Sequence, residues 1–210
     1  MKQSLQAAHF RGTVCKPLRR WLSACLILLL SSAATTSQAS EEILIVRVSD
    51  YQNQRELLID SESKFHLPKK VAAAIHHEIP LLFTTTIELT ESASFLGIKY
   101  QRTRRKIEYQ TQLYAYGVNH HYVLYNTRNQ NVQSFPTLDA ALETLGTLQS
   151  FPIAKLSELH PQQRYTIKMR IKLDYWKLPA PLIIDAMMDS DWRISSGWFE
   201  TFLKTPQSWQ

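Results

Sequence analysis

The chain has 210 residues, with 24 basic and 18 acidic side chains and only two cysteines. Five of the basic residues and both cysteines lie within residues 1–39, so the rest of the chain carries 19 basic and 18 acidic residues, a net charge of +1. This near-neutral balance does not favour nucleic acid as a partner, and the lack of cysteine after residue 39 excludes disulfides and thiolate metal sites there.

Residues 1–39 have the organisation of a secretory signal peptide. The five basic residues come first without any acidic one, and the apolar stretch Trp21–Ala34 follows with 14 residues. A helix that spans a bilayer needs roughly 20 apolar residues, so this stretch is short. Small residues just before position 40 predict cleavage after Ala39 and a periplasmic protein. The alternative is an uncleaved segment that anchors the protein in the inner membrane, as a structural protein of the envelope.

Strand patterns dominate the rest of the chain and begin with a hairpin. Ile43–Val48 is a β-branched run, and Glu56–Asp60 is its expected antiparallel partner across a polar turn. A helix is predicted from Pro68, with Val71, Ala74, Ile75 and Glu78 on one side. Pro80 ends this helix. The next strand, Leu81–Thr90, places on one face Leu81, Phe83, Thr85, Ile87 and Leu89.

The middle of the chain predicts a long strand, Lys99–Tyr116, with two different faces. One face carries Ile107, Tyr109, Thr111, Leu113 and Ala115. The other face carries Arg102, Arg104, Lys106, Glu108, Gln110 and Gln112. His121–Asn126 and Val132–Phe135 are shorter strands. Thr137 then caps a helix whose apolar positions are Leu138, Ala141, Leu142, Leu145 and Leu148.

The clearest strand is Arg164–Tyr175, where apolar and polar residues alternate without a break. Such alternation indicates one face in the core and the other in water. Strands in hairpins with only two short helices favour antiparallel sheets. We therefore expect a mainly β (α+β) fold, either a β-sandwich or a strongly curved antiparallel sheet, as a single domain of residues 40–210.

The order of several segments resembles a proteobacterial envelope family, domain of unknown function 4390. The segments are "LPKKVAAAIHHEIPLLFTTTIEL", "QSFPTLDAALETL", "RYTIKMRIKLDYWKLPAPLIIDAM" and "SDWRISSGWF". The resemblance implies no catalytic residues or cofactor, because none is assigned to the family, and association with a membrane sensor kinase implies an envelope role. Members carry a tryptophan-rich stretch where this chain has "ESASFLGIKY", so a smaller aromatic surface is expected there.

Three aspartates near the C-terminus, Asp185, Asp189 and Asp191, are candidates for a metal or acid–base site. A calcium loop needs a glycine among its ligands, and none lies between them. We expect Asp185 near the end of a strand entered through two prolines, and a turn in which Asp189 or Ser190 binds backbone amides. Trp192 and Trp198 are expected in the core or in a lid. The alternative is a metal-dependent or hydrolytic enzyme that uses the three carboxylates.

Other patterns do not support catalysis. Adjacent histidines, His76–His77 and His120–His121, diverge too widely for either pair to chelate one ion. Ser195–Gly197 lacks the glycines that flank a hydrolase nucleophile, and five glycines provide no phosphate-binding loop. We therefore predict no catalytic residue, no metal and no cofactor.

The candidate binding surface consists of basic side chains on two strands. They are Arg102, Arg104 and Lys106 on the first, and Arg164, Lys168, Arg170 and Lys172 on the second. Alternate residues of a strand lie about 6.6–6.8 Å apart, so each set would form a ladder of cations. Acidic residues that could lie between the ladders are Glu88, Glu91, Glu108 and Asp174.

Two interpretations of these ladders are open. The first is an ordinary sheet face that is exposed to water and has no binding role. The functional interpretation is a binding or accessory module that docks anionic lipid, polysaccharide or a membrane protein.

Overall fold

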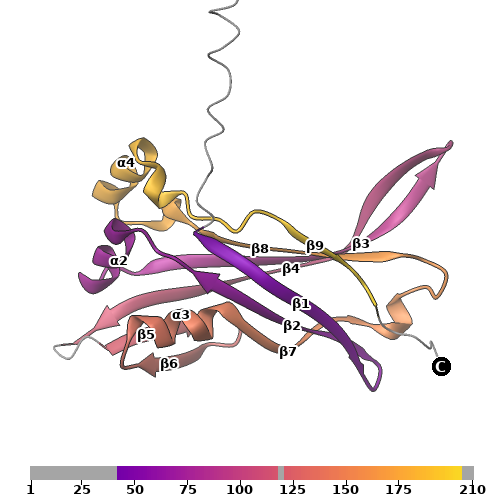
Figure 1. Cartoon of the computed structure of the whole chain (residues 1–210), viewed down its shortest axis with the longest axis horizontal. Coiled ribbons are helices and arrows are strands. Elements are labelled where there is room, and N and C mark those ends of the chain that lie inside the picture. Colours follow the sequence, from indigo (N-terminus) through magenta and orange to yellow (C-terminus); the bar gives the residue numbers. More distant parts are fainter. Residues whose placement is uncertain (1–41, 118–120, 205–210) are drawn as a thin grey trace, which may run out of the picture. The chain divides into compact units, whose positions relative to one another are not determined.

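The structure is a computed structural model that describes residues 42–117 and 121–204 (Figure 1). The described residues belong to one compact unit, Glu41–Gln210. The predicted signal peptide and its cleavage site lie outside the described residues. Within the described ranges, no helix has the length and apolar character needed to cross a membrane.

The larger of two sheets contains six antiparallel strands in the order β6-β5-β4-β3-β8-β9. The strands are β3 (Leu81–Phe95), β4 (Ile98–Tyr116), β5 (His121–Asn126), β6 (Asn131–Phe135), β8 (Tyr165–Leu173) and β9 (Phe199–Phe202). The two longest strands, β3 and β4, form the centre as one long hairpin. The strand β8 pairs with the other edge of β3, from Glu91 to Phe83.

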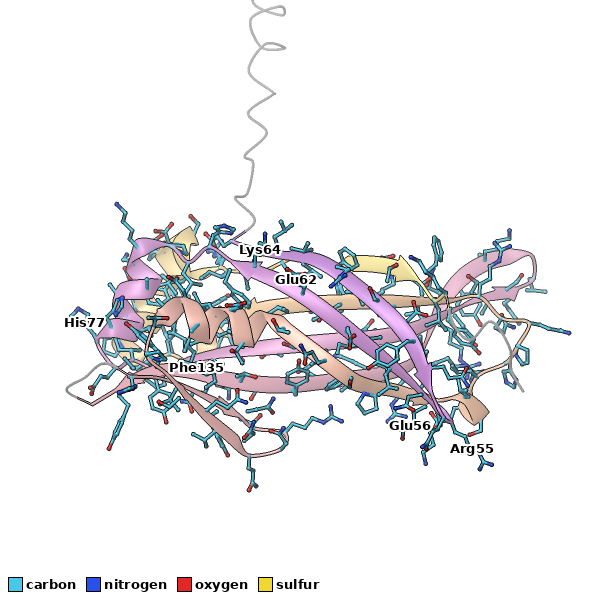
Figure 2. All side chains as sticks on the ribbon, turned by 60° about the horizontal axis from the view of Figure 1, so that its bottom comes forward. Arg55, Glu56, Glu62, Lys64, His77 and Phe135 are labelled. Carbon is cyan, nitrogen blue, oxygen red and sulfur yellow. The ribbon has the colours of Figure 1, made fainter. Side chains whose placement is uncertain are left out.

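The smaller sheet contains three antiparallel strands in the order β1-β2-β7. They are β1 (Ile43–Asn53), β2 (Glu56–Phe65) and β7 (Thr147–Lys155). Figures 1 and 2 show this sheet crossing one face of the larger sheet. The buried residues of both sheets form one continuous hydrophobic cluster between them. The expected mainly β, antiparallel fold is confirmed, and of the two expected arrangements the structure has two packed sheets.

Three α-helices and three 3-10 turns complete the domain. The helices are α2 (Lys69–His76), α3 (Leu138–Gly146) and α4 (Ala180–Met188), and the turns are η1 (Leu156–Glu158), η2 (Tyr175–Lys177) and η3 (Ser190–Trp192). Helix α3 begins as predicted, because the Thr137 hydroxyl accepts a hydrogen bond from the Ala140 amide at 3.2 Å. Helices α2 and α4 lie at one end of the domain, and the β3–β4 turn lies at the other (Figure 1).

The core follows the predicted alternation of the strands. On β8, the buried apolar side chains are Tyr165, Ile167, Met169, Ile171 and Leu173. Of the intervening residues, Lys168, Arg170 and Lys172 are half-exposed and Thr166 is buried. The largest fully buried side chain is Trp192, which follows α4 and is 1% exposed. Among the described residues, the cluster runs from Ile43 to Leu203 within the compact unit that begins at Glu41, so we expect this domain to fold by itself.

Two expectations about helices were wrong. The segment after Pro179, expected as a strand that ends near Asp185, is the helix α4. Proline is tolerated in the first turn of a helix because the amides there have no intrahelical partner. The helix after Thr137 ends at Gly146, and Leu148 lies in β7 instead. Gly146 packs so closely on the Ser63 carbonyl that any side chain would collide with it.

Candidate functional site

The two predicted basic ladders lie on β4 and β8, which β3 separates, except that Arg164 lies in the loop just before β8. Both strands pair with β3, so the ladders are not directly opposed. Glu88 on β3 pairs with Lys106 on one side and with Lys168 on the other, and Lys168 pairs in turn with Glu200 on β9. Across this row the charges alternate in sign, which stabilises neighbouring strands and neutralises the surface.

Ion pairs further neutralise this outer face of the six-stranded sheet. The ammonium nitrogen of Lys168 lies 2.8 Å from a carboxylate oxygen of Glu200, and that of Lys106 lies 3.2 Å from Glu108. The guanidinium of Arg170 lies 4.4 Å from the centre of the Trp198 ring. Trp198 is 41% exposed and therefore covers Arg170 instead of filling the core, whereas Trp192 fills the core as expected.

The expectation that Arg102, Arg104 and Lys106 share one face was wrong. The pairing of β3 with β4 shifts between Leu89 and Thr90, so that Lys106 pairs with Glu88 but Arg102 pairs with Glu91. This β-bulge adds one residue to β4. Since successive residues point to opposite faces, the extra residue turns Arg102 away from the face that carries Lys106.

Arg104, the extra residue of the bulge, is tied to a buried carboxylate. Its Nε atom lies 2.7 Å from Oε2 of Glu91, whose side chain is 6% exposed. The contact with Glu91 raises the pKa of Arg104 above its ordinary value. Arg104 therefore has a structural role at the point where the β3–β4 hairpin leaves the sheet.

Positive charge is concentrated at the turn end of the β3–β4 hairpin, residues 91–105, which we call the arm; its part from Ser92 to Gln101 extends beyond the pairing with β8. Figure 1 shows the arm extending past β8. The loop before β8 joins it, because the Ser92 amide donates to the Arg164 carbonyl at 3.2 Å and Arg105 lies 3.1 Å from Glu158. Five cations gather here, which we call the basic collar: Lys99, Arg102, Arg104, Arg105 and Arg164. Only Glu91 and Glu158 in the arm and residues 158–164 oppose them, which leaves a net charge of +3.

The structure thus brings Arg102, Arg104 and Arg164 together and separates them from Lys106, Lys168, Arg170 and Lys172. Sequence reasoning missed Lys99 and Arg105, because simple alternation placed them on the opposite face. The density of basic residues in "KYQRTRRK" was the available signal. Within the described residues, Lys99, Arg102 and Arg164 form no ion pair.

Two of the three aspartates, Asp185 and Asp189, hold a lysine instead of an open site, and the Asp191 side chain does not take part. The ammonium nitrogen of Lys70, in the first turn of α2, lies 2.9 Å from Asp185 and 2.6 Å from Asp189. The indole of Trp192 donates a hydrogen bond to Asp185 at 3.1 Å, and the Asp191 amide donates to Asp189 at 2.9 Å. The predicted turn at Asp189 is therefore present.

Charge attraction holds these groups in their ionised forms. The Lys70 contact lowers the pKa values of Asp185 and Asp189 below the ordinary 3.8, and the same contact raises the pKa of Lys70. The carboxylates of Asp185 and Asp189 both accept hydrogen bonds from the ammonium group of Lys70, and these contacts connect α4 to α2. We call Lys70, Asp185 and Asp189 the helix clamp. Sequence gave no signal for Lys70, because 115 residues separate it from Asp185.

The histidines are bound locally or exposed. The Nδ1 atom of His76 lies 2.9 Å from the Tyr122 hydroxyl, and His77 and His121 are exposed; His120 lies outside the described residues. Among the described residues, no group of three His, Asp or Glu side chains has a metal-binding arrangement.

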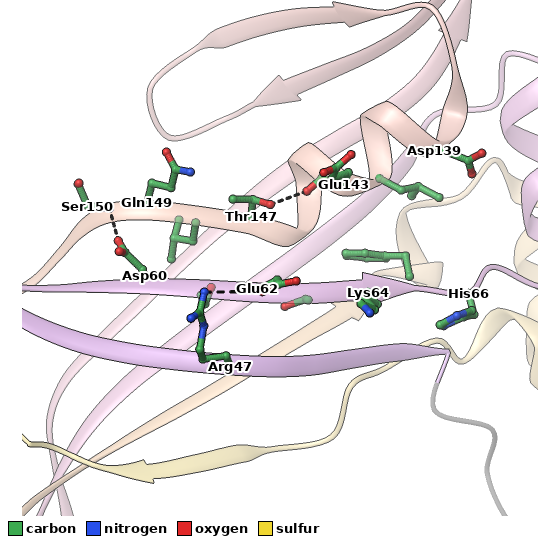
Figure 3. A pocket seen from close by; sticks show the side chains of 15 residues that line it. Arg47, Asp60, Glu62, Lys64, His66, Asp139, Glu143, Thr147, Gln149 and Ser150 are labelled. Atoms are coloured by element: carbon green, nitrogen blue, oxygen red, sulfur yellow. Dashed lines mark hydrogen bonds and ion pairs between the residues drawn. The ribbon is translucent and has the colours of Figure 1, made fainter.

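A polar hollow of about 720 Å³ lies between β2 and the α3–β7 segment (Figure 3). Its rim is internally paired: Asp60 accepts a hydrogen bond from the Ser150 amide at 2.8 Å, and Arg47 lies 3.7 Å from Glu62. The buried hydroxyls of Ser61 and Ser63 have no partner among the described residues. None of the residues predicted from sequence to bind or react lines this hollow.

Comparison with known proteins gives one match. Residues 40–201 match the family described as domain of unknown function (DUF4390). Neither a curated protein nor a solved structure gives a match. The family match covers the two-sheet domain up to the third residue of β9, including the arm and the helix clamp. The chain therefore belongs to the DUF4390 family.

Proposed function

We propose that this protein is an exported, non-catalytic docking module of the cell envelope, and that it binds an anionic membrane surface through the basic collar. The observation that carries the proposal is the separation of charge within the domain. On the outer face of the large sheet, Lys106 and Lys168 are paired with carboxylates and Trp198 covers Arg170. The collar gathers five cations against two acidic residues, and three of the five form no ion pair among the described residues. An unneutralised cluster of cations on a projecting element attracts anionic lipid.

The choice of a non-catalytic role rests on the helix clamp. Two of the three carboxylates that would serve an enzyme, Asp185 and Asp189, are occupied by Lys70, and their lowered pKa values suit them poorly to proton transfer near neutral pH. A periplasmic location follows from the predicted signal peptide and would place the collar within reach of a membrane. An uncleaved N-terminal anchor would serve the same docking role.

Vesicle binding at low and high salt tests the proposal. The chain from Ser40 is compared with a triple variant of its unpaired collar cations, Lys99→Gln, Arg102→Gln and Arg164→Gln. Each cation near an anionic surface contributes about 1 kcal/mol, so the variant should bind phosphatidylglycerol vesicles roughly a hundredfold more weakly at low salt. High salt should weaken the parent toward the variant.

A matched control removes three cations from the outer sheet face, Lys106→Gln, Arg170→Gln and Lys172→Gln. This control changes the net charge by the same amount, and it should keep most of the binding. Equal losses in both variants would contradict the proposal, because net charge and not the collar would then govern binding. Salt-insensitive binding by the parent would also contradict it.

A further inference from the structure

The turn of the arm carries a group of exposed apolar side chains beyond the basic collar. We call them the apolar tip: Phe95 (68% exposed), Leu96 (87%), Ile98 (71%) and Tyr100 (47%). None of them packs against the hydrophobic core. Solvent exposure of four large apolar residues within six positions is unfavourable in water, and such clusters mark binding sites.

Strand register places three of the four tip side chains on one face of the hairpin, and Leu96 lies in the turn between the strands. Phe95 pairs with Ile98, and Tyr100 pairs with Ala93, which lies two residues before Phe95. Residues two apart on a strand share a face, so both pairs point the same way. The opposite face in this region carries polar pairs, Ser94 with Lys99 and Ser92 with Gln101. The arm is therefore amphipathic, with an apolar face that no described residue covers.

The backbone at the tip is held in a conformation that a leucine adopts only at a cost. Leu96 has φ of +49° and Gly97 has φ of +82°, as in a two-residue turn with both residues left-handed. Asparagine or glycine is favoured at the first position, because a side chain with a bulky Cβ substituent crowds the backbone there. A leucine that is both strained and almost fully exposed stabilises neither the turn nor the core, and such strain points to a functional role.

We infer that the apolar tip inserts into the interface of an anionic bilayer while the basic collar contacts the lipid headgroups. Each paired position advances the strand by about 3.4 Å, so the tip lies roughly 15 Å beyond Glu91, the last residue of β3 paired with β8. Lys99 lies one paired row behind Phe95 and Arg102 lies four rows behind it, roughly 3.4 and 14 Å along the strand. When the tip is buried about 5–10 Å into the interface, Lys99 lies within the interface and Arg102 just outside it, so that both long side chains reach the headgroups.

A bilayer explains the arm better than a protein partner does. A stable protein interface uses about 20–30 residues on each side, whereas the free part of the arm, from Ser92 to Gln101, offers ten. A projecting apolar turn with cations behind it matches the polarity profile of a membrane interface, in which apolar side chains lie deeper than the charges. The inference rests on the proposed docking function and adds the insertion of the tip.

The test compares two apolar residues with equal exposure at opposite ends of the domain. Leu96 and Met188, in α4, are both 87% exposed. The parent chain from Ser40 is compared with Phe95→Ser/Leu96→Asn and with Met188→Gln for binding to mixed phosphatidylglycerol and phosphatidylcholine vesicles. The tip variant should bind about tenfold or more weakly, and the Met188 variant should bind like the parent. Circular dichroism checks that all three are folded.

A fluorescent label reports insertion directly. The chain from Ser40 contains no cysteine, so Leu96→Cys and Met188→Cys each accept one environment-sensitive label. The label at position 96 should shift to shorter wavelengths and brighten when vesicles are added, and the label at position 188 should not change. The shift should persist when salt is raised after binding at saturating lipid, because burial in an apolar environment is not screened.

The possible results separate this inference from the docking proposal. If the tip variant binds as tightly as the parent while the collar variant loses binding, insertion is wrong and docking by charge stands. If the label at position 188 responds instead, α4 contacts the lipid and the inference is wrong. If the parent binds no vesicle, both proposals are wrong, and an acidic protein becomes the partner to seek.

Discussion

The two ends of the domain expose the same kind of apolar surface in opposite electrostatic surroundings. At the arm, the exposed residues are Phe95, Leu96, Ile98 and Tyr100; at the helix end, they are Trp176, Ile184, Met187 and Met188. The arm with its neighbouring loop has five basic and two acidic residues, whereas residues 69–79 and 174–193 have four basic and five acidic ones. An anionic bilayer would attract the first end and not the second.

Local packing also differs between the two ends. The helix end is tied to the core by Trp192 and by the helix clamp. The arm beyond Glu91 consists of two strands with no third strand beside them in the described part of the chain. The comparison indicates that exposed apolar residues alone do not identify a membrane-binding element. The free projection and the cations around it distinguish the arm.

The largest expected effect lies at the helix end. Trp192→Ala removes a fully buried side chain and its hydrogen bond to Asp185, and it should lower the free energy of unfolding by about 3–5 kcal/mol. Denaturant unfolding measures the loss. Trp176→Ala, at the same end but 57% exposed, should cost less than about 1 kcal/mol. The folded fraction of each variant should bind vesicles as the parent does. A loss of binding in either variant would show that the helix end also contacts the membrane.

A smaller loss of stability is expected at the base of the arm. Arg104→Gln leaves the buried Glu91 carboxylate without its ion-pair partner, whereas Arg102→Gln removes a cation that has no such partner in the described residues. The melting temperature should therefore fall more for Arg104→Gln than for Arg102→Gln. Both variants should weaken vesicle binding at low salt. Equal melting temperatures would show that Glu91 does not depend on Arg104.

At the tip, stability and binding should change in opposite directions. Leu96→Asn replaces a strained leucine with a residue that tolerates positive φ, and it should raise the free energy of unfolding by about 1 kcal/mol. The same change should weaken vesicle binding, because it removes an apolar side chain from the tip. Thermal unfolding and vesicle sedimentation measure the two effects. A destabilised variant would show that Leu96 has a structural role.

The smallest effect should come from the helix clamp, which is exposed to solvent. Lys70→Met should lower the melting temperature at neutral pH, because it removes the attraction that lowers the pKa values of Asp185 and Asp189 below 3.8. A carboxylate whose pKa is lower in the folded state than in the unfolded state stabilises the fold at pH values above its ordinary pKa. This stabilisation is lost as the pH falls through the folded-state pKa. The difference between parent and variant should therefore close in strong acid.

Lys69→Met is the control for the clamp, because Lys69 is an exposed neighbour with no ion pair among the described residues. Thermal melts of the parent and both variants across the acidic range compare the two lysines. A Lys70 effect that is independent of pH would indicate that packing, and not charge, holds α4 against α2.

Alternation and capping predicted the local elements well, because they depend on neighbouring residues. The inward face of β8, the buried face of α2 and the Thr137 cap all follow from short-range patterns. The strands β7 and β9 were not predicted. β7 contains Pro152, which lacks a backbone donor, and it is tolerated because β7 is an edge strand. Pro179 and Pro181 predicted the start of a strand, but both prolines lie at the start of helix α4, where proline is also tolerated.

The sequence by itself determined the fold class, the faces of the regular strands and the family, since these depend on periodicity and on ordered segments. Only the tertiary structure decided the candidate sites. A single bulge near Arg104 separated Arg102 from Lys106, and a lysine from a distant helix occupied Asp185 and Asp189. Both outcomes depend on contacts between residues far apart in the chain or on a one-residue shift in register. Neither leaves a pattern in the local sequence.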